Sequence, residues 1–192
     1  MKKFFLAASL LAITASVAFA QSSTWTSDPA HSEVDFSVKH LSISNVHGRF
    51  GNVNATIVLN EADVTKSTVT ATIDVSTADT GMAQRDTHIK SPDFFDVATY
   101  STATFTSTSV AKSGSGLAVS GNFTLHGVTK PIVLEVEALG APIDSPMDHK
   151  QHRGFEATST ISRTAFGIGT KFPDAIVSDA VKLTIEIEAV KQ

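Results

Sequence analysis

Apolar and polar residues alternate along most of this chain with a period of two. Val53, Ala55 and Ile57, for example, are separated by polar residues. Successive side chains of a β-strand point to opposite faces, so this pattern predicts strands with one apolar face. The pattern recurs in about eight segments, which turn sequences such as residues 113–116 separate. The sequence therefore predicts a set of antiparallel strands.

Strands of this kind pack as a sandwich of two sheets or close into a barrel. A closed barrel has no unpaired strand edge, which an open sheet otherwise has to protect. The sequence therefore favours an all-β fold, an antiparallel barrel of about eight strands. The interior of a barrel of this size is either filled by side chains or holds one small ligand. The periodicity does not decide between these two interiors.

Residues on the inner face of the strands are the candidates to line the barrel interior. They are apolar, whereas Thr56, Thr72, Glu135 and Glu186 have the opposite parity and are expected to face outward. The predicted apolar lining consists of Phe36, Val38, Phe50, Ala55, Ile57, Ala71, Ile73, Phe105, Phe123, Leu134, Leu183 and Ile185.

The segment 77–96 interrupts the alternation. It opens with an Asp-Thr-Gly turn signal and continues with residues that repeat at the helical spacings of three and four. Pro92 disfavours helical geometry in the residue before it, which would end a helix there. We expect a short helical cap around residues 81–91, between two halves of the β structure, with Phe94 and Phe95 as its apolar anchors.

Charged and histidine side chains gather within this expected helix. Arg85, Asp86 and His88 allow two interpretations. They form a structural network that ties the cap to the barrel, or a polar mouth that meets the head group of a ligand. Because arginine suits a phosphate or a carboxylate, Arg85 and His88 are the predicted polar ligand contacts. Asp86 and Lys90 are four residues apart, a spacing at which they can pair on the helix surface.

Residues 1–20 have the composition of a secretory signal peptide. Two lysines precede an apolar run, and residues 18–20 form a small-x-small cleavage motif. A membrane anchor is the alternative, but the apolar run of about sixteen residues is shorter than the roughly twenty that a membrane span needs. We expect cleavage after Ala20, a mature domain of residues 21–192, a periplasmic location and no stable insertion into a membrane.

The charge and the lack of cysteine argue against nucleic-acid partners and against disulfide bonds. The chain carries 19 Asp and Glu against 15 Lys and Arg, a formal net charge of −4. This balance argues against binding to nucleic acid and against purely electrostatic docking on anionic lipid. The chain has no cysteine, so an exported protein of this sequence has no disulfide and depends on packing.

Motifs of catalysis are absent from the sequence. It has no Gly-x-Ser-x-Gly elbow, no phosphate-binding glycine loop and no cysteine nucleophile. Among the seven histidines, His149 and His152 lie three residues apart beside Asp148, which is compatible with a metal site. No further ligand has a recognisable spacing. A solvated loop is therefore the favoured interpretation, and neither a metal nor another cofactor is predicted.

A series of short motifs runs over nearly the whole mature chain. Its residues are Asp28, His31, Ser32, Val34, Phe36, Val38, His40, Gly48, Phe50, Asp79, Arg85, Asp86, His88, Ser91, Asp93, Phe94, Ala103, Thr104, Phe105, Gly121, Leu125 and residues 127–131 and 154–157. By the order and spacing of these motifs, the chain resembles the YceI-like family of exported lipid-binding proteins. It departs from the family pattern at Ser101, where a proline is usual, and at Ala165, where an aspartate is frequent.

The resemblance implies a lipocalin-like antiparallel barrel whose apolar interior holds a long isoprenoid or fatty chain. We therefore expect periplasmic binding, transport or sequestration of a long-chain amphiphilic lipid, without catalysis. The alternative is a filled barrel that acts as a stress-related structural or interaction protein without a stoichiometric ligand. A hydrolase or metal-dependent enzyme is a third hypothesis. The oligomeric state stays open between a monomer and a homodimer.

Overall fold

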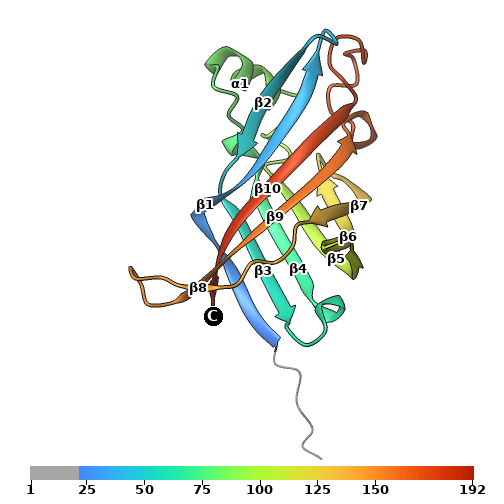
Figure 1. Cartoon of the computed structure of the whole chain (residues 1–192). Helices are drawn as coiled ribbons and strands as arrows, with labels where there is room; N and C mark the ends of the chain where they lie inside the picture. Colours follow the sequence, from blue (N-terminus) through green and yellow to red (C-terminus); the bar gives the residue numbers. More distant parts are fainter. Residues whose placement is uncertain (1–21) are drawn as a thin grey trace, which may run out of the picture.

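The structure, a computed structural model, describes residues 22–192 and consists mainly of β-strands (Figure 1). Residues 1–21, and with them the predicted signal peptide, lie outside the described residues. The strands are β1 (Ser22–His40), β2 (Ser44–Phe50), β3 (Val53–Asn60), β4 (Thr68–Asp74), β5 (Thr102–Ser113), β6 (Gly116–Leu125), β7 (Val128–Val136), β8 (Ile143–Asp144), β9 (Gln151–Ser162) and β10 (Ala180–Lys191). The described helices are α1 (Ala83–Lys90) and the 3₁₀ turns η1 (Val64–Lys66), η2 (Val75–Thr77) and η3 (Thr164–Phe166).

Eight of the strands close into an antiparallel barrel. Their order is β1, β3, β4, β5, β6, β7, β9 and β10, and β10 pairs with both β9 and β1, so the ring is complete. The predicted all-β antiparallel barrel is therefore confirmed. Two further strands lie outside the ring: β2 pairs with β1, and the short β8 pairs with β9.

The period of two decides which side chains face the barrel interior. Along β3, Val53, Ala55 and Ile57 are buried, while Asn54 and Thr56 are exposed. The other residues expected to face outward, Thr72, Glu135 and Glu186, are also exposed. The parity read from the sequence is thus the parity of the folded strands, because each residue of a strand reverses the side-chain direction.

Strand β1 is long enough to take part in two structures. Its first residues pair with β3, and its second half pairs with β2 to form a hairpin. This hairpin reaches the end of the barrel at which α1 lies (Figure 1). We call this end the α1 end. The opposite end, where β1 begins and β10 finishes, is the Trp25 end.

Helix α1 forms within the predicted cap segment, and local hydrogen bonds determine its start. The Asp86 carboxylate accepts hydrogen bonds from the Thr80 main-chain nitrogen at 2.8 Å and from the Thr80 hydroxyl at 2.5 Å. These bonds lower the pKa of Asp86. No ion pair joins Asp86 to Lys90 among the described residues, so the pairing suggested by their spacing does not form.

No helix within residues 22–192 is both long enough and apolar enough to cross a membrane.

The segment between β9 and β10 is organised around one buried arginine. Arg163 is 3% exposed, and its guanidinium donates only to main-chain carbonyl groups of the same segment. A charged donor bound to several carbonyls holds such a loop in one conformation. The accepting residues are Ile168, Gly169, Phe172, Val177 and Ser178.

Candidate functional site

The barrel encloses a cavity with hydrophobic walls. Ser67 is the one polar residue of its lining, and the Ser67 hydroxyl accepts a hydrogen bond from the Asn60 main-chain nitrogen at 3.0 Å. The volume of this cavity, counted as the space that the centre of a water molecule can occupy, is about 140 Å³. A single water needs only about 10–15 Å³ by the same measure, so the side chains leave part of the barrel interior unfilled.

Most of the predicted lining residues do line this cavity. They come from β2 and from six strands of the ring, namely β3, β4, β5, β6, β7 and β10. Their contact with a ligand stays a prediction. The ten residues in question are Phe50, Ala55, Ile57, Ala71, Ile73, Phe105, Phe123, Leu134, Leu183 and Ile185.

Phe36 and Val38, the other two predicted residues, are not part of the cavity lining. Both lie in the half of β1 that forms the hairpin with β2. Phe36 is buried, but its ring packs against Phe50 and Phe95, at centroid distances of 5.0 and 6.2 Å. The parity of the strand is correct here, but the side chain faces the cap segment, in which Phe95 acts as the expected anchor.

The sequence pattern missed some lining residues that lie outside the strands. Ser67 follows η1, and Leu139 follows the end of β7. Alternation is a property of strands, so it carries no signal for such positions. Several other lining residues share the parity of the predicted ones, for example Val34, Leu59 and Ile187.

The predicted polar contacts lie at the α1 end but outside the cavity lining. Arg85 donates from Nε to the Thr80 hydroxyl at 2.7 Å and from Nη2 to the Thr80 carbonyl at 2.8 Å. Thr80 belongs to the cap segment itself, so these bonds do not tie Arg85 to the barrel, and a contact of Arg85 with a ligand stays a prediction. His88 is half exposed, and its Nε2 lies 3.3 Å from the Asp93 carboxylate. Its ring meets the rings of Phe94 and Phe172 edge-on.

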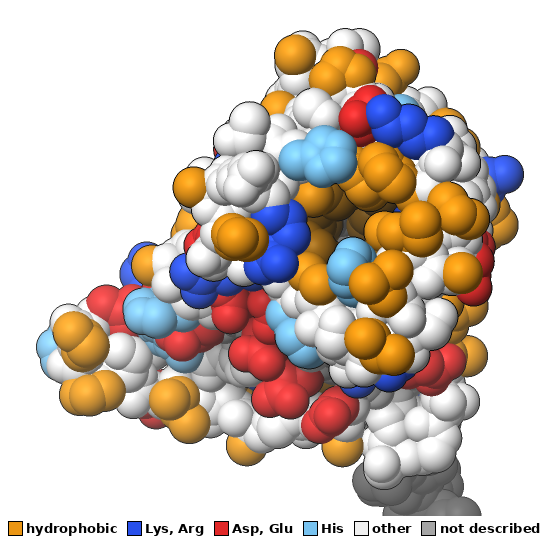
Figure 2. Space-filling view, turned by 90° about the horizontal axis from the view of Figure 1, so that it is seen from above, with side chains coloured by type: hydrophobic (Ala, Val, Ile, Leu, Met, Phe, Trp, Pro, Cys, Tyr) orange, Lys and Arg blue, Asp and Glu red, His pale blue; other side chains and the backbone are white. Residues whose placement is uncertain are grey.

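An aromatic and ionic contact joins the cap segment to the loop before β10. Phe94 stacks on Phe172 with a centroid distance of 4.8 Å, and Lys171 Nζ lies 2.5 Å from the Asp93 carboxylate. The hydrogen bond from Lys171 lowers the pKa of Asp93, and His88 adds to the effect. Viewed from this end, the molecule shows a hollow with hydrophobic walls, flanked by histidine and basic side chains (Figure 2).

The Trp25 end of the barrel is closed by side chains. Trp25 is 1% exposed and meets the cavity-lining Phe155 edge-on. The guanidinium of Arg153 lies 5.2 Å from the centroid of the Trp25 ring, and Lys191 Nζ lies 5.8 Å from it. Arg153 also pairs with Glu61 at 3.1 Å. Cations beside the indole stabilise this packing.

His149 and His152 have different surroundings. His149 is exposed, whereas His152 lies between two carboxylates. Its Nε2 is 3.0 Å from Asp148 and its Nδ1 is 2.7 Å from Glu188 of β10. These contacts hold the pKa of Asp148 at about 2 through the hydrogen bond with His152 and raise the pKa of His152.

Known proteins resemble this chain in sequence and share the fold that forms this cavity. A family model described as the YceI-like domain matches residues 25–189. The chain belongs to the YceI-like family. Protein YceI of Salmonella newport (strain SL254) is 41% identical over 162 residues, which cover 84% of this chain and 83% of that protein.

Solved structures show the same fold. The crystal structure of Burkholderia cenocepacia BcnA superposes with a TM-score of 0.76 at 25% identity, over 84% of this chain and 98% of that chain. A domain from Saccharophagus degradans, described as a polyisoprenoid binding domain, superposes with a TM-score of 0.61, over 90% of this chain and 100% of that chain. At 18% identity, this second likeness concerns the fold alone.

Proposed function

We propose that this YceI-like protein binds one long-chain amphiphilic lipid of the polyisoprenoid type and transports or sequesters it. The observation that carries the proposal is the cavity, because its lining contains no charged side chain and only one polar residue, Ser67. Each buried methylene group contributes roughly 0.8 kcal/mol, so a chain of several isoprene units binds without any charged contact. The description of the Saccharophagus degradans domain is consistent with such a ligand in this fold.

The two ends of the barrel give the bound lipid a direction. Trp25 and Arg153 close one end, whereas the α1 end is hollowed (Figure 2). The apolar tail would therefore point toward Trp25, and the head group would stay at the α1 end. His88 is half exposed there, and a head group would compete with Asp93 for its Nε2. Arg85 would contact it only with the donors that Thr80 leaves unused.

The side chains that line the cavity suit binding without catalysis. The Ser67 hydroxyl is the one polar side-chain group in the lining, and it already accepts a hydrogen bond from Asn60. A nucleophile needs an adjacent base to be activated, and no histidine or carboxylate is part of this lining. A binding role uses what the cavity offers, namely apolar surface removed from water.

We also propose that the protein acts in the periplasm as a mature domain of residues 21–192. The support is the sequence of residues 1–20, with its basic start, apolar run and small-x-small motif. A periplasmic carrier would move an apolar chain through an aqueous compartment. This requires a cavity that shields the chain from water.

Extraction of the purified protein with organic solvent, followed by mass spectrometry, tests the function. The protein should be prepared without detergent, and we expect about one long-chain lipid per chain. The delipidated protein should then take up a polyprenol in a saturable titration. A protein that carries no lipid and takes up none would support the alternative of a structural or interaction module. Glu186→Lys, on the outer face, is the matched control and should retain the lipid.

A further inference from the structure

A large bulge in β1 creates a cluster of metal-ligating side chains on the outer wall of the barrel. Ser27 pairs with Ala189 of β10, and Ser32 pairs with Ile187. The four residues 28–31 of β1 therefore stand opposite the single residue Glu188. A bulge of this kind redirects side chains, here toward the same partner.

The bulge is held in place by its own hydrogen bonds. The Ser32 hydroxyl donates to the Glu188 carbonyl and accepts from the Glu188 nitrogen, both at 3.2 Å. The Ala30 nitrogen donates to the Asp28 carboxylate at 2.9 Å. These bonds replace the interrupted ladder between the two strands. The Asp28 carboxylate is thus bound to the main chain of Ala30, and the main chain of Glu188 is bound to the Ser32 hydroxyl.

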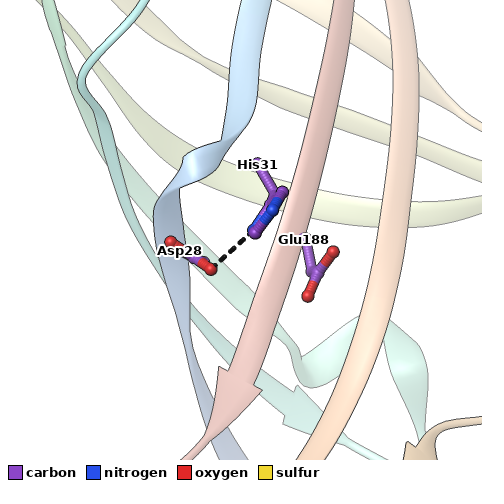
Figure 3. A group of neighbouring side chains, drawn as sticks. All are labelled: Asp28, His31 and Glu188. Atoms are coloured by element: carbon purple, nitrogen blue, oxygen red, sulfur yellow. Dashed lines mark hydrogen bonds and ion pairs between the residues drawn. The ribbon is translucent and has the colours of Figure 1, made fainter. Parts of the chain in front are cut away.

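Asp28, His31 and Glu188 bring one ligand atom each to within 4.8 Å of one another. Figure 3 shows His31 between Asp28 and Glu188, which come from two neighbouring strands. His31 Nδ1 lies 2.8 Å from the Asp28 carboxylate. His152 of β9 lies next to the cluster: its Nδ1 is 2.7 Å from Glu188 Oε1, but it is not one of the three residues whose ligand atoms all lie within 4.8 Å of one another.

The space beside this cluster is open. Gly154 of β9 pairs with Glu188 and has no side chain to fill the wall at this point. His31, His152 and Glu188 border a surface hollow of about 330 Å³. An ion therefore has access to the cluster from solvent.

The carboxylates of the cluster have no cationic side chain as a partner within the described residues. The ion pairs of Asp28, Asp148 and Glu188 are all made with histidines. Arg153, which also borders the hollow, pairs with Glu61 instead. Negative charge is thus in excess here, a condition that a divalent cation would relieve.

We propose that Asp28, His31 and Glu188 bind a divalent transition-metal ion on the outer wall of the barrel, and that His152, by turning toward the ion, supplies the fourth ligand. Two imidazole nitrogens and two carboxylate oxygens form a donor set that suits four-coordinate Zn²⁺. Calcium and magnesium prefer oxygen ligands alone, so the histidines select against them. Asp148 contacts the far nitrogen of His152 and would orient that ring toward the ion.

The bound ion would link the first strand of the domain to the last two. Asp28 and His31 belong to β1, Glu188 to β10 and His152 to β9. The pairing of β1 with β10 closes the ring. Metal binding would therefore raise the melting temperature of the folded protein, since the ligands are brought together only by folding. This role is independent of the proposed lipid.

Titration of the full mature chain, without a polyhistidine tag, with Zn²⁺ tests the site. Competition with a chromogenic chelator should give one ion per chain and a higher melting temperature. His31→Ala and Glu188→Gln should each weaken Zn²⁺ binding by more than about tenfold, and Asp148→Asn by about tenfold. His149→Ala is the matched control, because His149 is exposed on the same loop as Asp148 and lies outside the cluster.

Three results would overturn the proposal. They are the absence of saturable Zn²⁺ binding, an unchanged affinity in both His31→Ala and Glu188→Gln, and Ca²⁺ binding as tight as Zn²⁺ binding. Circular dichroism of the variants shows whether they are folded. His31 is 63% exposed and Glu188 40% exposed, so neither change removes core packing. A loss of Zn²⁺ binding in folded variants therefore reports on the ligands.

Discussion

The ring of Phe36 lies over Gly48, its partner across the β1–β2 hairpin, and occupies the space that a side chain at position 48 would need. A Cβ placed on Gly48 would come within 2.3 Å of the Phe36 ring. Phe50 and Phe95 hold this ring from other sides. The hairpin and the cap segment thus share one aromatic core, which explains why Phe36 does not line the cavity.

This contact predicts a size limit at position 48. Gly48→Ala should lower the free energy of unfolding by roughly 1–3 kcal/mol, because the packed ring of Phe36 has no space to move into. Gly51→Ala is the control, since nothing lies within 4 Å of the Cβ position there. The control should stay within about 0.5 kcal/mol of wild type. Urea unfolding measures both, and equal stabilities would contradict the packing.

The barrel faces predict opposite effects for two neighbouring residues of β10. Ile185 lines the cavity and Glu186 is exposed. Ile185→Asp should cost roughly 3 kcal/mol or more, or prevent folding, because an unpaired buried charge is costly. Glu186→Lys should stay within about 0.5 kcal/mol of wild type. Thermal and urea unfolding compare them, and similar losses in both variants would reject the assignment of faces.

Enlarging a small residue of the cavity wall should have different effects in a lipid carrier and in a filled barrel. Ala55 and Ala71 are cross-strand partners, and both line the cavity. Ala71→Phe or Ala55→Phe should compete with lipid and leave the delipidated protein stable. In a filled interior the same change would overpack the core and cost typically about 1–3 kcal/mol.

The measurement for these variants combines lipid counts with melting curves of delipidated protein from the same preparations. Loss of lipid with unchanged melting supports the carrier. Destabilisation of both delipidated variants, together with a wild type that never carries lipid, would remove the carrier hypothesis. Both positions are needed because one of them alone could lie beyond the reach of the bound chain.

Asp179 predicts a loss of stability in acid. Hydrogen bonds from Ser162 and Thr164 lower the pKa of the Asp179 carboxyl in the folded protein. A carboxyl with a lowered folded-state pKa stabilises the protein above its unfolded pKa, near about 4, and this contribution is lost as the pH falls through the folded value. The stability difference between wild type and Asp179→Asn should therefore shrink below about pH 4. A difference that stays constant from neutral to strongly acidic pH would contradict this.

The small residues before Gln21 predict how the precursor is processed. Ala18→Arg combined with Ala20→Arg should block cleavage, because signal peptidase needs small residues at these positions. Mass spectrometry of the protein from the periplasmic fraction shows its first residue. Wild type should begin at Gln21. Finding the same first residue in the double variant would refute the proposed cleavage site.

Much of the fold could be predicted because strand alternation is a local property. Thr56 and Ile57 face opposite sides in the folded barrel, as their sequence neighbours indicate. Helix α1 was also predictable, from the break in alternation and from Pro92. Local signals could not tell that Phe36 packs against Gly48, Phe50 and Phe95, so its place outside the cavity lining was not predictable.

The candidate site was predictable only in its character. The apolar lining follows from parity, and Leu183 and Ile185 line the cavity as expected. The polar contacts depend on which groups already have partners. Thr80 takes up two donors of Arg85, and no spacing in the sequence reveals this competition.

The sequence by itself determined the all-β class, the inward and outward faces and the apolar character of the interior. These follow from alternation, which each residue shares with its immediate neighbours. Only the tertiary structure decided that Trp25 closes one end of the barrel and that Asp28 and His31 meet Glu188. Glu188 lies far from Asp28 along the chain, and a bulge in β1 sets their register. Register between distant strands comes from packing of the whole barrel, so no local pattern encodes it.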